Sequence, residues 1–191
     1  MKIESDEIIV ITGQQGYGKT TLAKFLIKKL LENGIDVVII DPNDEYGEFE
    51  GEADRIVPEG GDFSRVYEAL KKAWEKGNRA LIVDEADIVF PIREQLSGVK
   101  YDIVHRGRHR NLLRIFVVRR LANLNKDVVS QAKKIISFYQ FLPNDLKYLK
   151  EFMGDYAELT KNLPKYHFIV FEQGEVRFYK PVTGDHEIEI V

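Results

Sequence analysis

One short segment of the chain carries the residue types that bind nucleotide phosphates. Residues 13–20 read Gly-Gln-Gln-Gly-Tyr-Gly-Lys-Thr and match the pattern G-x-x-x-x-G-K-[ST] at every position. Glycines let the backbone turn tightly and bring its N–H groups onto phosphate oxygens. The lysine of such a loop reaches the β- and γ-phosphates, and the threonine hydroxyl is a ligand of Mg²⁺. We therefore expect ATP and Mg²⁺ to bind at this phosphate loop, through Gly13, Gln14, Gln15, Gly16, Tyr17, Gly18, Lys19, Thr20 and Thr21.

A pair of carboxylates at the end of an apolar run is the second chemical element. Asp84 and Glu85 directly follow Ala80–Val83. An aspartate in this position can hold Mg²⁺, and a glutamate beside it can orient or deprotonate the attacking water. We expect Thr20 and Asp84 to be metal ligands and Glu85 to be the base of ATP hydrolysis. The alternative is that both carboxylates cap the following turn, in a loop that is acidic in any case.

The sequence does not carry the signals of a guanine-nucleotide enzyme. Residues 84–87 lack the glycine of D-x-x-G, and residues 125–128 read Asn-Lys-Asp-Val instead of N-K-x-D. ATP is therefore the expected nucleotide.

The apolar pattern predicts the elements that position these groups. Continuous apolar runs alternate with segments of helical spacing, which is typical of a parallel sheet covered by helices on both faces. Strands are predicted at 8–11, 37–40, 80–83, 112–118 and 134–138, and helices at 19–33, 63–76, 127–133, 144–152 and 155–162. Residues 167–171 and 176–179 flank Gln173-Gly174 and predict an antiparallel hairpin. A turn at Gly184-Asp185 and residues 188–190 indicate a last strand.

Together these patterns predict one α/β domain over residues 1–191. Its sheet is doubly wound and mostly parallel, and its C-terminal part, about residues 165–191, forms the hairpin.

Composition excludes several other classes of site. The 191 residues are 44% apolar and 31% charged, as in globular proteins. The chain has no cysteine for disulfides or thiolate metal sites, and its four histidines lack the spacing of zinc ligands. No apolar run is long enough to cross a bilayer, and the acidic start does not resemble a signal peptide. We expect a cytoplasmic protein, in the host cytoplasm if the protein is viral.

Charge is distributed unevenly along the chain. The net charge is −3, but residues 41–54 contain carboxylates and no basic residue, whereas residues 105–120 contain arginines and no acidic residue. Loops that follow the strands of a doubly wound sheet emerge at its carboxyl edge. We expect both segments at that edge, near the nucleotide, where they could meet between subunits. The alternative is two solvated faces.

Further segments resemble, in order and spacing, those of one family of ATPases. They are Asp-Pro-Asn-Asp-Glu-Tyr at 41–46, Arg-His at 108–109, Arg-Leu-Ala-Asn-Leu at 120–124, Val-Val-Ser-Gln-Ala at 128–132, Leu-Pro-Asn-Asp-Leu at 142–146 and Lys-Tyr-His-Phe at 165–168. Over about residues 7–182 the chain resembles the HerA–FtsK group of P-loop ATPases. It looks most similar to the genome-packaging ATPases of archaeal viruses. The resemblance implies a P-loop fold of the type that has an additional strand and a catalytic glutamate.

The same resemblance implies a motor that hydrolyses ATP and moves DNA. It implies a homo-oligomeric ring, double-stranded DNA bound without sequence specificity, a separate loading or portal-type protein, and no membrane. It also points to Arg108 as an arginine that completes a neighbouring active site, with Arg120 as second candidate. The expected catalytic residues are therefore Lys19, Glu85, Arg108 and Arg120. The alternative for Arg108 is a place in a solvated surface loop.

Two other functions remain open from the residues. One is a nucleotide-dependent switch with slow turnover that regulates a partner. Arg119 favours it, because this arginine stands where the family has a glutamine or asparagine that senses the γ-phosphate. The other is a small-molecule kinase, in which residues 105–110 would form a lid over the acceptor. Glu85 beside Asp84 favours water as the acceptor instead.

Overall fold

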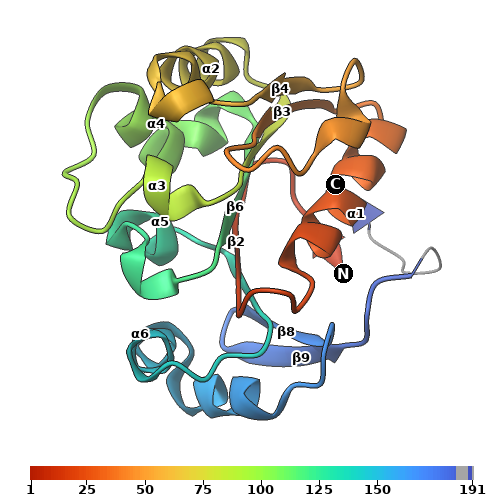
Figure 1. The fold of residues 1–191 in the computed structure, drawn as a ribbon, viewed down its shortest axis with the longest axis vertical. Helices are drawn as coiled ribbons and strands as arrows, with labels where there is room; N and C mark the ends of the chain where they lie inside the picture. The colour runs from red at the N-terminus through yellow and green to blue at the C-terminus, as the bar shows by residue number, and fades with distance from the viewer. Residues whose placement is uncertain (184–188, 191) are drawn as a thin grey trace.

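A mostly parallel sheet forms the centre of the molecule. The structure, a computed structural model, describes residues 1–183 and 189–190. Eight strands pair in the order β4-β3-β5-β6-β2-β7-β8-β9 (Figure 1). The parallel strands are β4 (Asp54–Ile56), β3 (Asp36–Ile40), β5 (Arg79–Val83), β6 (Leu112–Val118), β2 (Ile8–Thr12) and β7 (Lys134–Ser137), and the antiparallel strands are β8 (Phe168–Glu172) and β9 (Glu175–Tyr179). The predicted fold class, with its C-terminal hairpin, is confirmed.

Apolar side chains are buried on both faces of this sheet. Along β2, Ile8 and Val10 belong to one hydrophobic core, and Ile9 and Ile11 belong to the other. Figure 1 shows α1 on one side of the sheet and α2 to α5 on the other. The α-helix on the first side is α1 (Lys19–Glu32), and those packed against the opposite core are α2 (Ser64–Lys76), α3 (Ala86–Val89), α4 (Gly98–Arg106), α5 (Lys126–Ser130) and α6 (Pro143–Met153). Because helices cover both faces, the strands lack alternation between apolar and polar residues.

The additional strand expected in this type of fold is present. β6 lies between β5, which leads to Asp84, and β2, which leads into the phosphate loop. Phe116 of β6 is level with Val83 of β5 on one side and with Val10 of β2 on the other. Parallel strands in this register end at the same edge of the sheet, so the segments that follow them emerge together.

Several elements differ from those that the apolar pattern predicts. β4 is a short outer strand that contains Asp54 and Arg55, so it shows no apolar run. α4 includes His105 and Arg106, where charge alone indicated a surface loop. The helix predicted at 127–133 is α5, which ends earlier than predicted. The helix predicted at 155–162 is a 3₁₀ helix. The described 3₁₀ helices are Gly47–Phe49, Glu59–Gly61, Gly107–Arg110, Leu121–Asn123 and Gly154–Asn162.

The ends of the described chain form a small sheet of their own. β10 (Glu189–Ile190) pairs in parallel with β1 (Lys2–Ile3), apart from the large sheet. The last strand predicted at 188–190 is therefore present over its last two residues. The turn predicted at Gly184-Asp185 lies outside the described residues.

None of the helices in the described part of the chain has the length and hydropathy that a membrane crossing requires.

A buried ion cluster ties the hairpin to the parallel strands. Lys134 at the start of β7 is almost fully buried, and its Nζ lies 2.5 Å from Glu7 Oε2 and 2.9 Å from Glu172 Oε1. Glu7 directly precedes β2, and Glu172 ends β8. Burial raises the pKa of Glu7, and the hydrogen bond from Lys134 opposes that shift. Burial of the two charges costs desolvation free energy, which their mutual attraction offsets. Removal of one partner leaves the other charge buried without that compensation.

We therefore expect Lys134→Met to lower the free energy of unfolding by about 3 kcal/mol, because it leaves Glu7 buried without its cation. The matched control is Lys133→Met. Lys133 also lies 2.5 Å from a carboxylate, that of Glu4, but both side chains are partly exposed. Its loss should cost less than about 1 kcal/mol. Urea unfolding measures both, and equal losses would contradict the role of burial.

Candidate active site

The phosphate loop connects β2 to α1 and requires glycine at its first position. A Cβ on Gly13 would lie 2.6 Å from Cβ of Phe138, and φ of Gly13 is 147°. The next residue joins the loop to the segment that follows β7, because Gln14 N–H donates to the carbonyl of Tyr139 at 2.9 Å. At the loop's tip, the Tyr17 and Tyr139 rings stack with centroids 4.8 Å apart. The conformation of the loop is therefore set by β7 as well as by its own sequence.

Lys19 is folded back into the loop. Its Nζ donates to the carbonyl of Gln14 at 3.3 Å. Burial lowers the pKa of Lys19, Glu85 and Asp84 oppose the shift, and Arg119 adds to it. The N-terminal end of α1 contributes further positive potential. The ammonium and the helix end together form an environment that favours phosphate.

A cleft of about 400 Å³ joins the phosphate loop to the segments that follow β3, β5 and β6. Most of the expected binding residues line it, whereas Gly13, Gln14 and Tyr17 shape the loop from outside the lining. The residues that line the cleft are Gln15, Gly16, Gly18, Lys19, Thr20, Thr21, Asn43, Glu45, Asp84, Glu85, Arg119 and Tyr166.

Asp84 and Thr20 bring oxygen ligands into this cleft. Burial raises the pKa of Asp84 to about 6, and the Glu85 N–H that donates to its Oδ1 partly opposes the shift. The Thr20 hydroxyl donates to Glu45 Oε2 at 3.2 Å. A nearby cation would favour the ionised form of this buried carboxylate. Carboxylate and hydroxyl oxygens suit Mg²⁺, which takes its other ligands from phosphates and water. The residues present therefore fit the expected ion.

Glu85 has an unusual backbone conformation and a defined side-chain partner. Its φ and ψ are 45° and 47°, in the left-handed region that costs a residue with a side chain about 1 kcal/mol or more. Its Oε1 accepts a hydrogen bond from Asn43 Nδ2 at 3.2 Å. Asn43 thus controls where the expected base points. Asn43 and Glu45 belong to the segment at 41–46 that resembles the HerA–FtsK ATPases, but no local pattern predicts a role for either.

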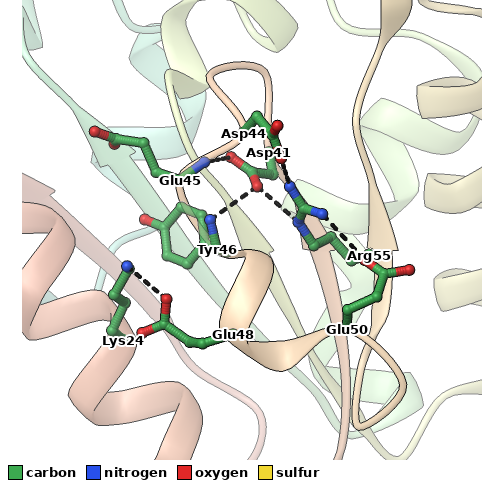
Figure 2. Close-up of polar contacts among 8 residues, drawn as sticks. All are labelled: Lys24, Asp41, Asp44, Glu45, Tyr46, Glu48, Glu50 and Arg55. Atoms are coloured by element: carbon green, nitrogen blue, oxygen red, sulfur yellow. Dashed lines mark hydrogen bonds and ion pairs between the residues drawn. The ribbon is translucent and has the colours of Figure 1, made fainter.

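Asp41 holds the loop that presents these two residues (Figure 2). Its buried carboxylate accepts the N–H groups of Glu45 at 2.9 Å and Tyr46 at 3.0 Å. Arg55 Nε donates to the same carboxylate at 2.8 Å. The loop is therefore fixed at its base, and its tip faces the cleft.

The charge of residues 41–54 is largely compensated within the chain. Arg55, one residue beyond the segment, pairs with Asp41, Asp44 and Glu50, and Lys24 pairs with Glu48 at 2.7 Å. The negative charge expected on this face is therefore reduced, because several of its carboxylates form ion pairs that stabilise the loop.

The arginines of residues 105–120 divide between the two edges of the sheet. Arg108 precedes β6 and lines a separate cleft with Glu7 and Arg114, at the amino end of the strands. The expectation that the whole basic segment lies at the carboxyl edge is wrong for Arg108, because a residue before a parallel strand emerges at the opposite edge from one after it. Arg119, directly after β6, lines the nucleotide cleft.

Arg120 has a structural contact. Its Nε donates to Asp145 Oδ2 at 2.7 Å, and Asp145 is fully buried and also accepts Ala122 N–H at 3.1 Å. This pair joins the turn after β6 to α6. Arg120 is not among the residues that line the cleft, so the arrangement gives it no catalytic contact within its own chain.

Residues 8–158 match the family model of the central domain of helicase HerA. The chain belongs to the HerA family. As a HerA-family domain with this phosphate loop and Asp84–Glu85 pair, it binds and hydrolyses ATP. No curated protein sequence matches it.

Solved structures similar to this HerA-family chain include a viral NTPase. The genome-packaging NTPase B204 of Sulfolobus turreted icosahedral virus 2, in complex with ATP-gammaS, is 26% identical, with a TM-score of 0.83 over 94% of this chain and 99% of B204. B204 described as the DNA-packaging ATPase of Sulfolobus turreted icosahedral virus is 27% identical, with a TM-score of 0.83 over 93% of this chain and 98% of B204. VirB4 of Thermoanaerobacter pseudethanolicus, at 13% identity, shares the fold, with a TM-score of 0.70 over 93% of this chain and 90% of VirB4.

We expect Glu85→Gln to retain ATP binding and to lower the rate of hydrolysis by about 10²-fold or more, because the amide keeps the size of the side chain but cannot accept the proton of water. Asp87→Asn is the control, since Asp87 is close in sequence and does not line the cleft. Calorimetry with ATP and a phosphate-release assay separate binding from chemistry. Unchanged turnover in Glu85→Gln would mean that another residue activates water.

Proposed function

We propose that this ATPase is the motor subunit of a homo-oligomeric ring that moves double-stranded DNA. The observation that carries the proposal is the division of the catalytic groups between two edges of the sheet. Lys19, Asp84 and Glu85 meet at the carboxyl edge, and Arg108 lies at the amino edge. An arginine there cannot serve the nucleotide of its own chain, but a head-to-tail neighbour can receive it.

The surroundings of Arg108 support this role. Arg108 is exposed, and within the described residues its guanidinium has no hydrogen bond or ion pair, although its backbone carbonyl accepts Asn111 N–H at 3.1 Å. The turn beneath it is held by buried Arg114, whose Nη1 donates to the carbonyl of Ile103 at 2.9 Å. A Cβ on Gly107 would clash with that guanidinium, so a side chain here would displace Arg114 from its place under the turn. A rigid turn with a free guanidinium favours contact with a partner over a purely solvated loop.

Within the cleft, we assign Thr20 and Asp84 as the protein ligands of Mg²⁺, with phosphate oxygens and water as the rest. The ion would neutralise charge on the β- and γ-phosphates. Lys19 would hold the same phosphates, and Glu85 would accept the proton of the attacking water. Asn43, which donates to the Glu85 carboxylate, would hold this base in position.

DNA as the substrate is supported by the HerA family and by B204, whose description names DNA packaging. Arg106 and Arg110 are engaged within the chain, Arg106 with Asp102 and Arg110 with carbonyls at the end of α2. The contacts expected with DNA are to its phosphate backbone, without sequence specificity. We infer that the protein acts in the cytoplasm.

A mixing experiment tests the shared site. Arg108→Ala and Glu85→Gln subunits should each be nearly inactive alone. Mixed in equal amounts, about one interface in four pairs an intact Glu85 site with an intact Arg108 donor, so activity should return to that extent. Lys19→Ala mixed with Glu85→Gln is the control and should restore nothing, because both residues belong to the same cleft. If native mass spectrometry detects mixed assemblies and activity stays absent, Arg108 does not act in trans.

A second measurement tests the substrate and separates the motor from a slow nucleotide switch. ATP turnover should rise on addition of double-stranded DNA, and DNA binding should weaken steeply as salt increases, because phosphate contacts release counterions. No affinity for DNA at low salt, with ATP present, would favour the switch.

A further inference from the structure

The sheet order gives the nucleotide cleft a direction. Glu85 and Arg119 follow β5 and β6, and the phosphate loop follows β2. Since Glu85 marks the position of the γ-phosphate, a triphosphate held by Lys19 extends its other end away from β5 and β6. That direction leads toward β7 and β8, on the other side of β2. The base and ribose therefore have to lie beside the hairpin strands.

Tyr166 lies at that end of the cleft. β8 is antiparallel to β7, with Ile169 level with Ser137, so the start of β8 is at the edge where β7 ends. Tyr166 precedes β8 and lines the cleft beside Gly16 and Gly18. A Cβ on Gly18 would be 3.1 Å from Cδ1 of Tyr166, so the ring lies next to the loop's backbone. An aromatic ring thus borders the path of the nucleotide past its phosphates.

Much of the Tyr166 ring remains accessible. The residue is 44% exposed, although large aromatic residues favour burial. Lys165 Nζ lies over the ring, 5.0 Å from its centre. Lys165 is itself exposed, so its flexible side chain can move aside for another ring.

The backbone of Tyr166 also departs from what its side chain prefers. Its φ is 66°, in a turn where His167 N–H donates to the carbonyl of Pro164 at 3.1 Å. Glycine or asparagine is usual where a turn requires positive φ. Within the described residues, the other side chains at positive φ belong to Asp, Asn, Glu and Gln. A tyrosine kept in a strained position next to a binding cleft indicates that its ring is needed there.

We propose that Tyr166 is the stacking platform for the adenine base of ATP. The proposal rests on the nucleotide site and is independent of ring formation and DNA. Stacking of a base on an aromatic ring acts on the π-face, so it strengthens binding of every nucleotide and favours the larger purines over pyrimidines. The competing role is structural, in which the ring supports Gly18 and the base makes no contact with it.

A comparison of ligands with and without a base separates these roles. Affinities for Mg²⁺–AMPPCP and for Mg²⁺–tripolyphosphate are measured by calorimetry on the unassembled chain without DNA. In Tyr166→Asn, which tolerates positive φ and lacks the aromatic ring, AMPPCP should bind about 10-fold more weakly. Tripolyphosphate should bind within about twofold of the wild type, because the phosphate loop is unchanged.

Two variants complete the test. Tyr166→Phe keeps the ring and should bind AMPPCP like the wild type. Tyr156→Ala removes a tyrosine that is also 44% exposed but does not line the cleft, and it should change neither affinity. If Tyr166→Asn weakens both ligands equally, the ring only supports the loop, and the proposal is overturned. It is also overturned if AMPPCP affinity does not change. Neither result would bear on Arg108 or on DNA.

Discussion

The common register of β5, β6 and β2 is the constraint on which the active site depends. Phe116 is level with Val83, where β5 ends, and with Val10, two residues before β2 and β6 end together, so the residues that follow all three strands meet at one edge. Lys19, Asp84, Glu85 and Arg119 reach the same cleft for this reason. The same rule separates Arg108 from them, because it stands before β6. The reversal of β8 then returns Tyr166 to the carboxyl edge, which a parallel strand in its place would not do.

Several charged residues of this chain stabilise loops through buried hydrogen bonds, which their pattern along the sequence does not indicate. Asp41 accepts two backbone N–H groups and the Arg55 guanidinium, and so holds the loop of Asn43 and Glu45. Asp145 performs the same task for the turn that begins with Arg120. Both carboxylates are fully buried. These pairs give rigidity to the loops beside the nucleotide cleft, since a buried carboxylate tolerates few alternative arrangements.

The sequence predicted the phosphate loop and the Asp84–Glu85 pair, because each has a local pattern with a direct physical cause. The additional strand was implied by the family resemblance. The sequence did not predict the partners of Glu85 and Thr20. Asn43 lies 42 residues before Glu85 in the chain, and the pairing of β3 with β5 brings the two together. Glu45 lies 25 residues after its partner Thr20, which is on α1. The pairing of Arg120 with Asp145 was not predicted for a similar reason, since the two residues are on different elements. Long-range pairing of side chains leaves no periodic signal.

The two outer strands of the large sheet carry a consequence for how copies of this protein can associate. An unpaired strand edge offers N–H and C=O groups to another chain and invites aggregation unless charge discourages it. β4 has only three residues, two of them Asp54 and Arg55, and β9 exposes Glu175 and Arg177. β9 also exposes Phe178, so charge disfavours strand addition between copies most clearly at β4. Concentrated protein should resist amyloid-like growth through that edge.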